Sequence, residues 1–310
     1  MTTDRRSRRP TLTIGLPNFG TFFPIGEWHR FVDLARVADD AGVDRVLLVD
    51  HVVMGPNTEA YSWGRFPTPP DAPWLEPLTL LAAMATGTSR VRLATGILIA
   101  PLRPAVLLAK QAATLDVVSQ GRLDLGVGTG WQREEYEAEG LDFDRRGQLL
   151  TDTIAACKVL WRDTPAAFDA PTVSFRDVYC EPKPVQEGGV PLWIGGSLHA
   201  RNLDRLIHAG DAWIPIMGES VDGIADGARR IRAAWAAAGR DPERLQVQAP
   251  LRIARGDDGR PDVGRSMACV PELVAAGATD IHVHLAAFCR DAARAPGTIA
   301  DVVTRFRAAA

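Results

Sequence analysis

Paired cysteines, long apolar runs and a strong net charge are all missing from this chain, and each absence excludes a class of protein. The four cysteines stand far apart and form no C-x-x-C pair. That spacing argues against a zinc knuckle, a redox pair or a disulfide scaffold and favours a reducing cytoplasm. No stretch approaches the ~20 consecutive apolar residues of a membrane-spanning helix. We therefore expect neither a membrane protein nor a disulfide-stabilised domain.

The charge balance also limits the partners. Lys+Arg 35 against Asp+Glu 38 gives a net charge of -3, so no overall field attracts nucleic acid or an anionic membrane. We expect small-molecule partners, with no nucleic acid and no membrane.

Length and composition describe an ordinary globular chain. With 310 residues, 46% of them hydrophobic and 24% charged, the length is compatible with one large domain or two small ones. Residues 1–10 are rich in arginine and lack the apolar core of a secretory signal. We interpret residues 1–10 as a disordered leader and residues 11–310 as a single domain.

Short apolar, β-branched segments alternate with helical patterns along the chain. The first unit is a strand at 11–17, ended by a proline, and a helix at 27–41 with one apolar face, ended by Gly42. Eight such strands over about 300 residues favour a closed (β/α)8 TIM barrel over an open doubly wound sheet. Insertions are predicted after strand two and before strand five. The other predicted strands are 46–49, 91–100, 123–127, 191–194, 212–216, 245–253 and 280–285, and the other helices are 77–85, 105–118, 149–161, 200–208 and 224–238.

Reactive residues of such a barrel stand at the carboxyl ends of its strands. Asp50 and His51 come directly after the second strand. Histidine is the side chain that changes charge nearest neutral pH, so His51 is a candidate acid or base. A histidine that merely bonds a loop carbonyl explains the position equally well, and both interpretations stay open.

Glycines mark the ends of three further strands. Gly96 interrupts the third strand, which predicts a bulge with or without a ligand. The run Gly126-Val127-Gly128-Thr129-Gly130 follows the fourth strand and could turn N–H groups toward a ligand, although it is neither a dinucleotide fingerprint nor a Walker motif. Gly195-Gly196-Ser197 precedes a helix, where free N–H donors favour an anion. The plainer alternative at that point is a tight turn capped by Ser197.

Aromatic residues and a histidine pair complete the candidates. The segment 51–77 holds Tyr61, Trp63, Phe66 and Trp74, which is typical of a lid or an apolar binding wall, or of packing on the barrel rim. On the last strand, His282 and His284 share one face at the spacing of a metal pair. Too few further histidines exist for a metal-dependent hydrolase, so we expect no metal.

The segment 94–147 resembles the luciferase-like monooxygenase superfamily. Asp50-His51, Pro182-Lys183-Pro184 and Trp193-Ile194-Gly195-Gly196 extend the resemblance from about residue 11 to residue 216. The motifs that carry it in combination are Ala109-Lys110-Gln111, Thr114-Leu115-Asp116, Ser119-x-Gly121-Arg122 and Gly126-Val127-Gly128-x-Gly130-Trp131.

Within that superfamily the chain is most similar to the branch that uses the deazaflavin coenzyme F420, with FMN-dependent members more distant. The resemblance implies a barrel that binds the flat ring at its carboxyl mouth, with a bulge at Gly96–Ile97, often a non-proline cis peptide, behind the ring. It also makes a homodimer an expectation. The residues that it assigns to the cofactor are Asp50, Thr95, Gly96, Ile97, Gly128, Thr129, Gly130, Gly195, Gly196 and Ser197.

The expected activity is hydride transfer between deazaflavin and a small organic substrate, as a reductase or dehydrogenase. We expect His51 to act as acid or base, Asp50 to orient it, and Trp63, Trp74 and Trp131 to form the substrate wall. Trp131 stands where some sugar-phosphate dehydrogenases of this family carry a glutamate, which argues against a charged sugar. The alternatives are an FMN-dependent monooxygenase, a metal-dependent hydrolase and a non-catalytic flavin-binding barrel.

Overall fold

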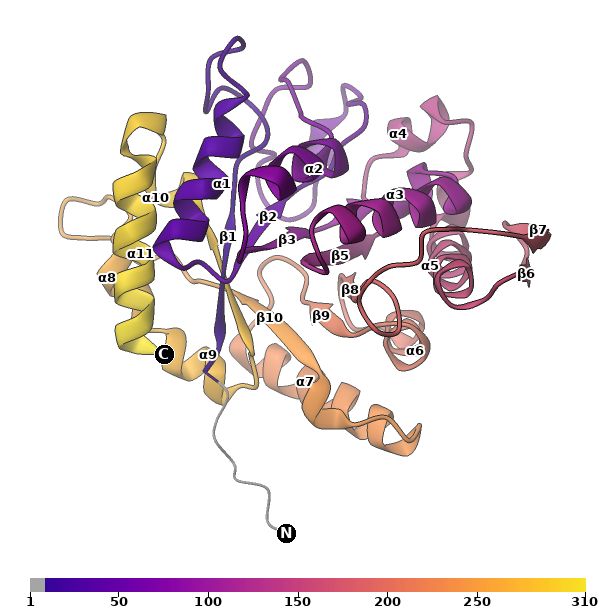
Figure 1. The fold of residues 1–310 in the computed structure, drawn as a ribbon. Helices are drawn as coiled ribbons and strands as arrows, with labels where there is room; N and C mark the ends of the chain where they lie inside the picture. Colours follow the sequence, from indigo (N-terminus) through magenta and orange to yellow (C-terminus); the bar gives the residue numbers. More distant parts are fainter. Residues whose placement is uncertain (1–8) are drawn as a thin grey trace.

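The computed structural model describes residues 9–310, so the predicted leader lies outside the described part except for its last two residues. Eight parallel strands pair side by side in a ring (Figure 1). The ring is closed because β11 pairs with β1 and β3 pairs with β5. This confirms the predicted (β/α)8 TIM barrel. Its strands are β1 (Thr11–Gly15), β2 (Arg45–Leu48), β3 (Arg92–Thr95), β5 (Leu123–Gly128), β8 (Leu192–Gly195), β9 (Ala212–Ile214), β10 (Gln246–Pro250) and β11 (Asp280–His284).

Helices cover the outside of the ring in chain order, and α11 returns to lie beside α1 (Figure 1). The sequence of α1 explains this packing, because Phe31, Leu34 and Ala38 form one apolar face that is buried against the barrel. The helix ends at Gly42, whose φ of +82° favours glycine. None of the helices in residues 9–310 combines the length and the apolarity needed to cross a bilayer. The long helices are α1 (Arg30–Ala41), α2 (Pro77–Gly87), α3 (Ala105–Val118), α5 (Arg146–Arg162), α6 (Ala200–His208), α7 (Val221–Ala237) and α11 (Ala295–Ala309).

Shorter elements fill the connections. The insertion before β8 contains an antiparallel hairpin of β6 (Ala166–Asp169) and β7 (Ser174–Val178), and the insertion after β2 holds only one 3-10 turn, at Thr58–Ala60. Further 3-10 turns lie at Ala100–Leu102, Phe143–Arg145, Pro242–Arg244 and Ala292–Arg294, and the short helices are α4 (Arg133–Ala138), α8 (Val263–Met267), α9 (Val270–Ala275) and α10 (Leu285–Phe288).

Two sequence predictions need correction. The third strand is not continuous from 91 to 100: β3 ends at Thr95, and β4 (Leu98–Ile99) resumes beyond a cis peptide bond between Gly96 and Ile97. The last helix, α11, was not predicted, although Ile299, Val302 and Phe306 recur at helical spacing and are buried.

The inside of the ring is charged at the amino ends of the strands. The guanidinium of Arg45 donates to Asp124 at 2.8 Å and to Asp280 at 2.7 Å, and all three side chains are buried. The same guanidinium lies 4.3 Å from the ring centroid of Trp193. Opposite charges therefore tie β2, β5 and β11 together across the barrel.

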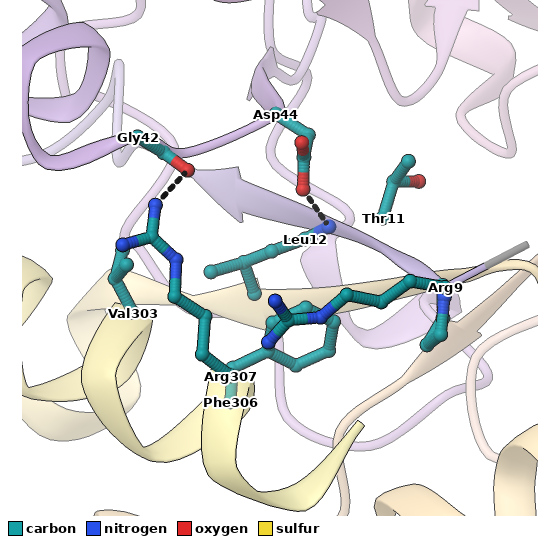
Figure 2. Close-up of a pocket in the computed structure, with 9 residues that line it drawn as sticks. Arg9, Thr11, Leu12, Gly42, Asp44, Val303, Phe306 and Arg307 are labelled. Carbon is teal, nitrogen blue, oxygen red and sulfur yellow. Dashed lines mark hydrogen bonds between the residues drawn. The ribbon is translucent and has the colours of Figure 1, made fainter.

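A cavity of about 220 Å³ also lies at the amino ends, between the start of β1 and the end of α11 (Figure 2). Arg307 of α11 donates to the carbonyl oxygen of Gly42 at 3.3 Å, and the carboxylate of Asp44 accepts from the N–H of Leu12 at 2.8 Å (Figure 2). This cavity is at the opposite end of the barrel from the predicted site, so it does not belong to that site.

Candidate active site

His51 is held by a buried carboxylate at the carboxyl end of β2. Its Nδ1 lies 3.0 Å from Oε2 of Glu135 on α4, and the imidazole is 9% exposed. The other oxygen of Glu135 accepts from the N–H of Val52 at 3.0 Å. Because a carboxylate can only accept, Nδ1 carries the hydrogen and Nε2 is left to exchange a proton.

This contact corrects the predicted partner of His51. The carboxylate of Asp50 does not orient His51 but accepts from the N–H of Ile99 at 2.8 Å and from Arg103 at 2.7 Å. Asp50 therefore joins the end of β2 to β4. Glu135 went unnoticed in the sequence, where it is one acidic residue among several and nothing local shows which strand end it reaches.

The start of α4 also fixes the main chain that follows His51. The side-chain amide of Gln132, which is 1% exposed, accepts from the N–H of Gly55 at 2.9 Å and donates to its carbonyl at 3.2 Å. Gln132 and Glu135 together position residues 51–55, so the loop that carries the histidine is anchored by side chains from the first turn of α4.

Aromatic side chains surround the other faces of His51. The ring centroids of Trp74 and Trp131 lie 4.7 Å and 5.9 Å from that of His51. Trp63 is 38% exposed and contacts these aromatic rings only through Tyr61, whose ring centroid lies 5.3 Å from that of Trp63. Of the three predicted wall residues, the structure brings two to the histidine and leaves Trp63 at the edge. We call Tyr61, Trp63, Phe66, Trp74 and Trp131 the aromatic cluster.

The bulge after β3 places one apolar side chain between two neighbouring strands. A Cβ built on Gly195 would lie 2.5 Å from Cγ2 of Ile97, and one on Gly128 would lie 3.1 Å from its Cδ1. Both glycines thus leave room for Ile97, a role that the sequence did not suggest. Gly96 has the same function toward Leu47, whose side chain a Cβ there would strike.

Three predicted cofactor residues already contact other parts of the protein. The hydroxyl of Thr95 is buried and donates to the carbonyl of Gly126 at 2.7 Å. The carbonyl of Thr129 accepts from the hydroxyl of Tyr136 at 2.5 Å. Gly130 has a φ of +65° and packs against Ile99. These residues stabilise the bulge and the loop after β5.

α6 carries a buried arginine, Arg205, whose hydrogen bonds all go to uncharged acceptors, while the nearby carboxylate of Asp204 pairs with His208. Arg205 is 3% exposed, and its guanidinium donates to the side-chain oxygen of Asn202 at 2.5 Å, the hydroxyl of Thr151 at 3.0 Å and the carbonyl of Gly147 at 2.5 Å. All three acceptors are neutral. Burial, together with the nearby charge of Arg201, lowers the pKa of Arg205 to about 10.

Asn202 links this buried cation to the predicted anion site. Its amide donates to the carbonyl of Ser197 at 2.9 Å, and Gly196 beside it has a φ of +116°, a conformation that favours glycine. The helix cap is His199, whose side chain accepts from the N–H of Asn202 at 3.3 Å. The alternative of a turn capped by Ser197 is therefore wrong.

His282 and His284 lie together at the end of β11, with ring centroids 4.1 Å apart. Within residues 9–310, no group of three or more His, Cys, Asp or Glu side chains could hold a metal ion. The pair on its own therefore lacks the further ligands that a metal-dependent hydrolase needs.

Fold and site together define the class: a (β/α)8 barrel with a buried His51–Glu135 pair, an aromatic cluster and a buried arginine near the carboxyl ends of its strands. The chain belongs to the luciferase-like monooxygenase family, whose family model matches residues 13–260. That membership makes it an oxidoreductase whose relatives use a flavin-type cofactor, either F420 or FMN.

The chain is similar in sequence to an uncharacterized protein, to an F420-dependent enzyme and to a flavin-dependent one. An uncharacterized protein of Mycobacterium tuberculosis is 33% identical over 201 residues, which are 61% of this chain and 70% of that protein. The F420-dependent glucose-6-phosphate dehydrogenase of Nocardia farcinica is 30% identical over 239 residues, covering 74% of this chain and 66% of the relative. The oxygenase component of the flavin-dependent trigonelline monooxygenase of Acinetobacter baylyi is 30% identical, covering 54% of this chain and 42% of the relative.

Solved structures share the fold. An F420-dependent secondary alcohol dehydrogenase matches with a TM-score of 0.75 at 14% identity, over 96% of this chain and 99% of the other. The monooxygenase RslO1 of Streptomyces bottropensis matches with a TM-score of 0.72 at 21% identity, over 95% of this chain and 98% of the other.

Proposed function

We propose that this protein is an F420-dependent oxidoreductase that transfers a hydride between deazaflavin and a small organic substrate, as a reductase or dehydrogenase. The observation that carries the proposal is the buried Arg205 of α6, which bonds Asn202 and is linked through it to the Gly195-Gly196-Ser197 turn that the resemblance assigns to the cofactor phosphate. The relative from Nocardia farcinica, whose name states F420 dependence, spans more of this chain than the trigonelline monooxygenase does.

The residues at α6 fit an anionic group. The guanidinium of Arg205 bonds only neutral acceptors, and the nearby carboxylate of Asp204 pairs with His208 instead. The guanidinium therefore has less compensation than buried charges usually have. A phosphate at the start of the helix would supply it, and the helix dipole and free N–H groups favour the same charge. Gly196 has no side chain here, but its N–H already donates to the carbonyl of Ile214 at 3.0 Å. Arg205 would act through Asn202 as a positioning residue, while the main chain at Ser197 and the first turn of α6 would hold the phosphate.

The residues at the bulge fit a flat ring. Ile97 rests on Gly128 and Gly195, which gives an apolar surface between β3 and β8. Asp50 fixes β4 just beyond it through the N–H of Ile99. The ring would lie against Ile97, on the same barrel edge as the α6 site.

The proposed chemistry divides between cofactor and protein. Bound deazaflavin supplies or accepts the hydride, which is why such enzymes need no oxygen. The protein exchanges a proton at Nε2 of His51, while Glu135 keeps Nδ1 protonated. The aromatic cluster packs against the imidazole and excludes water from it.

The runner-up is an FMN-dependent monooxygenase, which the similarity to the trigonelline monooxygenase favours. Parallel equilibrium titrations with F420 and FMN distinguish the two. We expect F420 to bind and, in an absorbance screen of imines, enones, alcohols and hemiacetals, to change redox state with at least one class. Tight FMN binding with oxygen consumption and no response to F420 would show the proposal to be wrong. If F420 binds but reacts with no substrate class, the non-catalytic flavin-binding barrel becomes the better interpretation.

A further inference from the structure

A second, small cavity opens at the carboxyl end of the barrel, where β1, β2 and β11 lie side by side. Its volume is about 30 Å³, room for a group of about the size of a water molecule. Gly15, Phe19, Val49 and His284 are among the residues that line it, and of all its lining residues only His284 has a side chain that can form hydrogen bonds. None of the lining side chains is a lysine, arginine or carboxylate.

A second histidine stands directly beside this cavity. His282 is 7% exposed, its ring centroid is 4.1 Å from that of His284, and its Nε2 finds no hydrogen-bond partner among residues 9–310. Glycine at position 15 leaves room for the His282 ring, since a Cβ on Gly15 would lie 2.5 Å from Nε2 of His282. Burial, reinforced by His284, lowers the pKa of His282 well below its usual range, so the ring stays neutral near pH 7.

Phe19 connects the wall of the cavity to the aromatic cluster. Phe19, which lines the cavity, stacks on Trp74 with ring centroids 4.3 Å apart, and Trp74 lies 4.7 Å from His51. A molecule lying along these rings would therefore present one end to His284.

We propose that this cavity binds the polar end of the substrate, and that the substrate is a neutral molecule with an apolar or aromatic body and one hydrogen-bonding oxygen or nitrogen. The body packs on the aromatic cluster, and the heteroatom bonds His284, with His282 beside it. The pKa values of both imidazoles are lowered, so near pH 7 they can donate or accept a hydrogen bond but offer an anion no ion pair. This inference rests on the proposed function, because it assigns the substrate of the same site.

The test compares three probes that share one body: benzyl alcohol, toluene and benzoate. Isothermal titration calorimetry on the full chain, with and without saturating F420, gives the Kd of each. We expect benzyl alcohol to bind about tenfold more tightly than toluene, the effect of one hydrogen bond, and more tightly than benzoate. His284→Ala should bring the alcohol and toluene within about twofold of each other, whereas His284→Gln, whose amide still forms hydrogen bonds, should keep part of the preference.

His208→Ala is the matched control, because His208 lies on the outer helix α6 with its side chain 73% exposed; it should bind all three probes like the unmodified protein. Thermal unfolding of each variant shows whether it is folded. The inference is wrong if benzoate binds as tightly as benzyl alcohol, if His284→Ala keeps the preference while folded, or if no probe binds. Failure of F420 to bind, with the probe preferences intact, would overturn the proposed function alone.

Discussion

At the scale of single residues, one buried carboxylate decides which nitrogen of His51 is free to exchange a proton. Glu135 accepts from Nδ1 and from the N–H of Val52, so it fixes both the ring and the main chain behind it. Asp50, one position before the histidine, has a separate task at β4. Two acidic residues near one histidine thus act on different parts of the site.

Replacing the histidine tests its role in catalysis. We expect His51→Ala to keep F420 affinity within a few-fold and to lower kcat by roughly 10² or more, the usual scale for a lost general acid or base. Steady-state kinetics with the substrate identified by the absorbance screen and a cofactor titration measure the two quantities. A variant with unchanged kcat would remove His51 from the mechanism.

Replacing the carboxylate of Glu135 tests whether it sets the tautomer of His51. The amide of Glu135→Gln can donate to Nδ1, which would shift the hydrogen to Nε2 and leave the wrong nitrogen for proton transfer. We expect kcat to fall by roughly 10² to 10⁴ and the pH profile of kcat/KM to change, with F420 affinity retained. Glu134→Gln, a substitution one residue earlier on α4, is the control. An unchanged pH profile would contradict the positioning role.

At the scale of elements, the site depends on where strands stop and helices begin. The bulge after β3 inserts Ile97 between Gly128 and Gly195. Asn202 in the first turn of α6 bonds the Gly195–Ser197 turn, and Arg205 in the last turn of the same helix bonds Asn202. Each feature joins neighbouring strand ends into one surface at the barrel mouth.

Adding a negative charge tests the predicted anion site. Gly196→Asp puts a carboxylate and a Cβ at a residue with a φ of +116°, so we expect F420 binding to be abolished. Gly188→Asp is the control, because Gly188 also has a positive φ, of +79°, yet a Cβ there would meet nothing within 4 Å. A fluorescence titration measures the affinities, and circular dichroism shows whether each variant is folded. Normal F420 binding by Gly196→Asp would remove the phosphate from this turn.

At the scale of the whole molecule, charged side chains inside the barrel hold distant strands in register. Arg45 bonds Asp124 and Asp280, and Arg92 bonds Asp124 again at 2.7 Å. Burial alone would raise the pKa of the Asp124 carboxyl, but Arg45 and Arg92 outweigh it and hold that pKa below its ordinary value. The predicted homodimer also belongs to this scale and stays a prediction, which sedimentation equilibrium can check.

Removing one charge of this network should destabilise the barrel. We expect Asp124→Asn to lower the free energy of unfolding by about 3 kcal/mol, since it leaves the buried Arg45 with Asp280 as its one bonded carboxylate and removes the ion-pair partner of the partly exposed Arg92. Denaturant unfolding at neutral pH measures the change. Asp301→Asn, which breaks an ion pair between half-exposed side chains on α11, is the control and should cost about 0.5 kcal/mol or less.

The same carboxylate has a pH signature. Because its folded pKa is below the unfolded value of 3.8, its contribution is fully present above that value and is lost as the pH falls through the lowered folded pKa. In acid, the stability of Asp124→Asn should therefore approach that of the unmodified protein. A stability difference that is the same at neutral pH and in acid would contradict this account.

The sequence by itself determined the repeating architecture and the breaks within it. The helices predicted at 105–118 and 200–208 have those bounds in the structure, because apolar spacing and terminal residues are local properties of the chain. Gly96 predicted a bulge for the same reason, since glycine inside an apolar strand is a local signal.

Only the tertiary structure decided which side chains meet. His51 and Glu135 are 84 positions apart, and Asp50 turns toward Ile99 and Arg103 although His51 is its neighbour in the chain. The buried arginine at α6 likewise looks like any other arginine in the sequence. Such contacts follow from strand register and the closing of the ring, and no local pattern encodes them; the chain therefore marks where the site lies, and the closed barrel selects its partners.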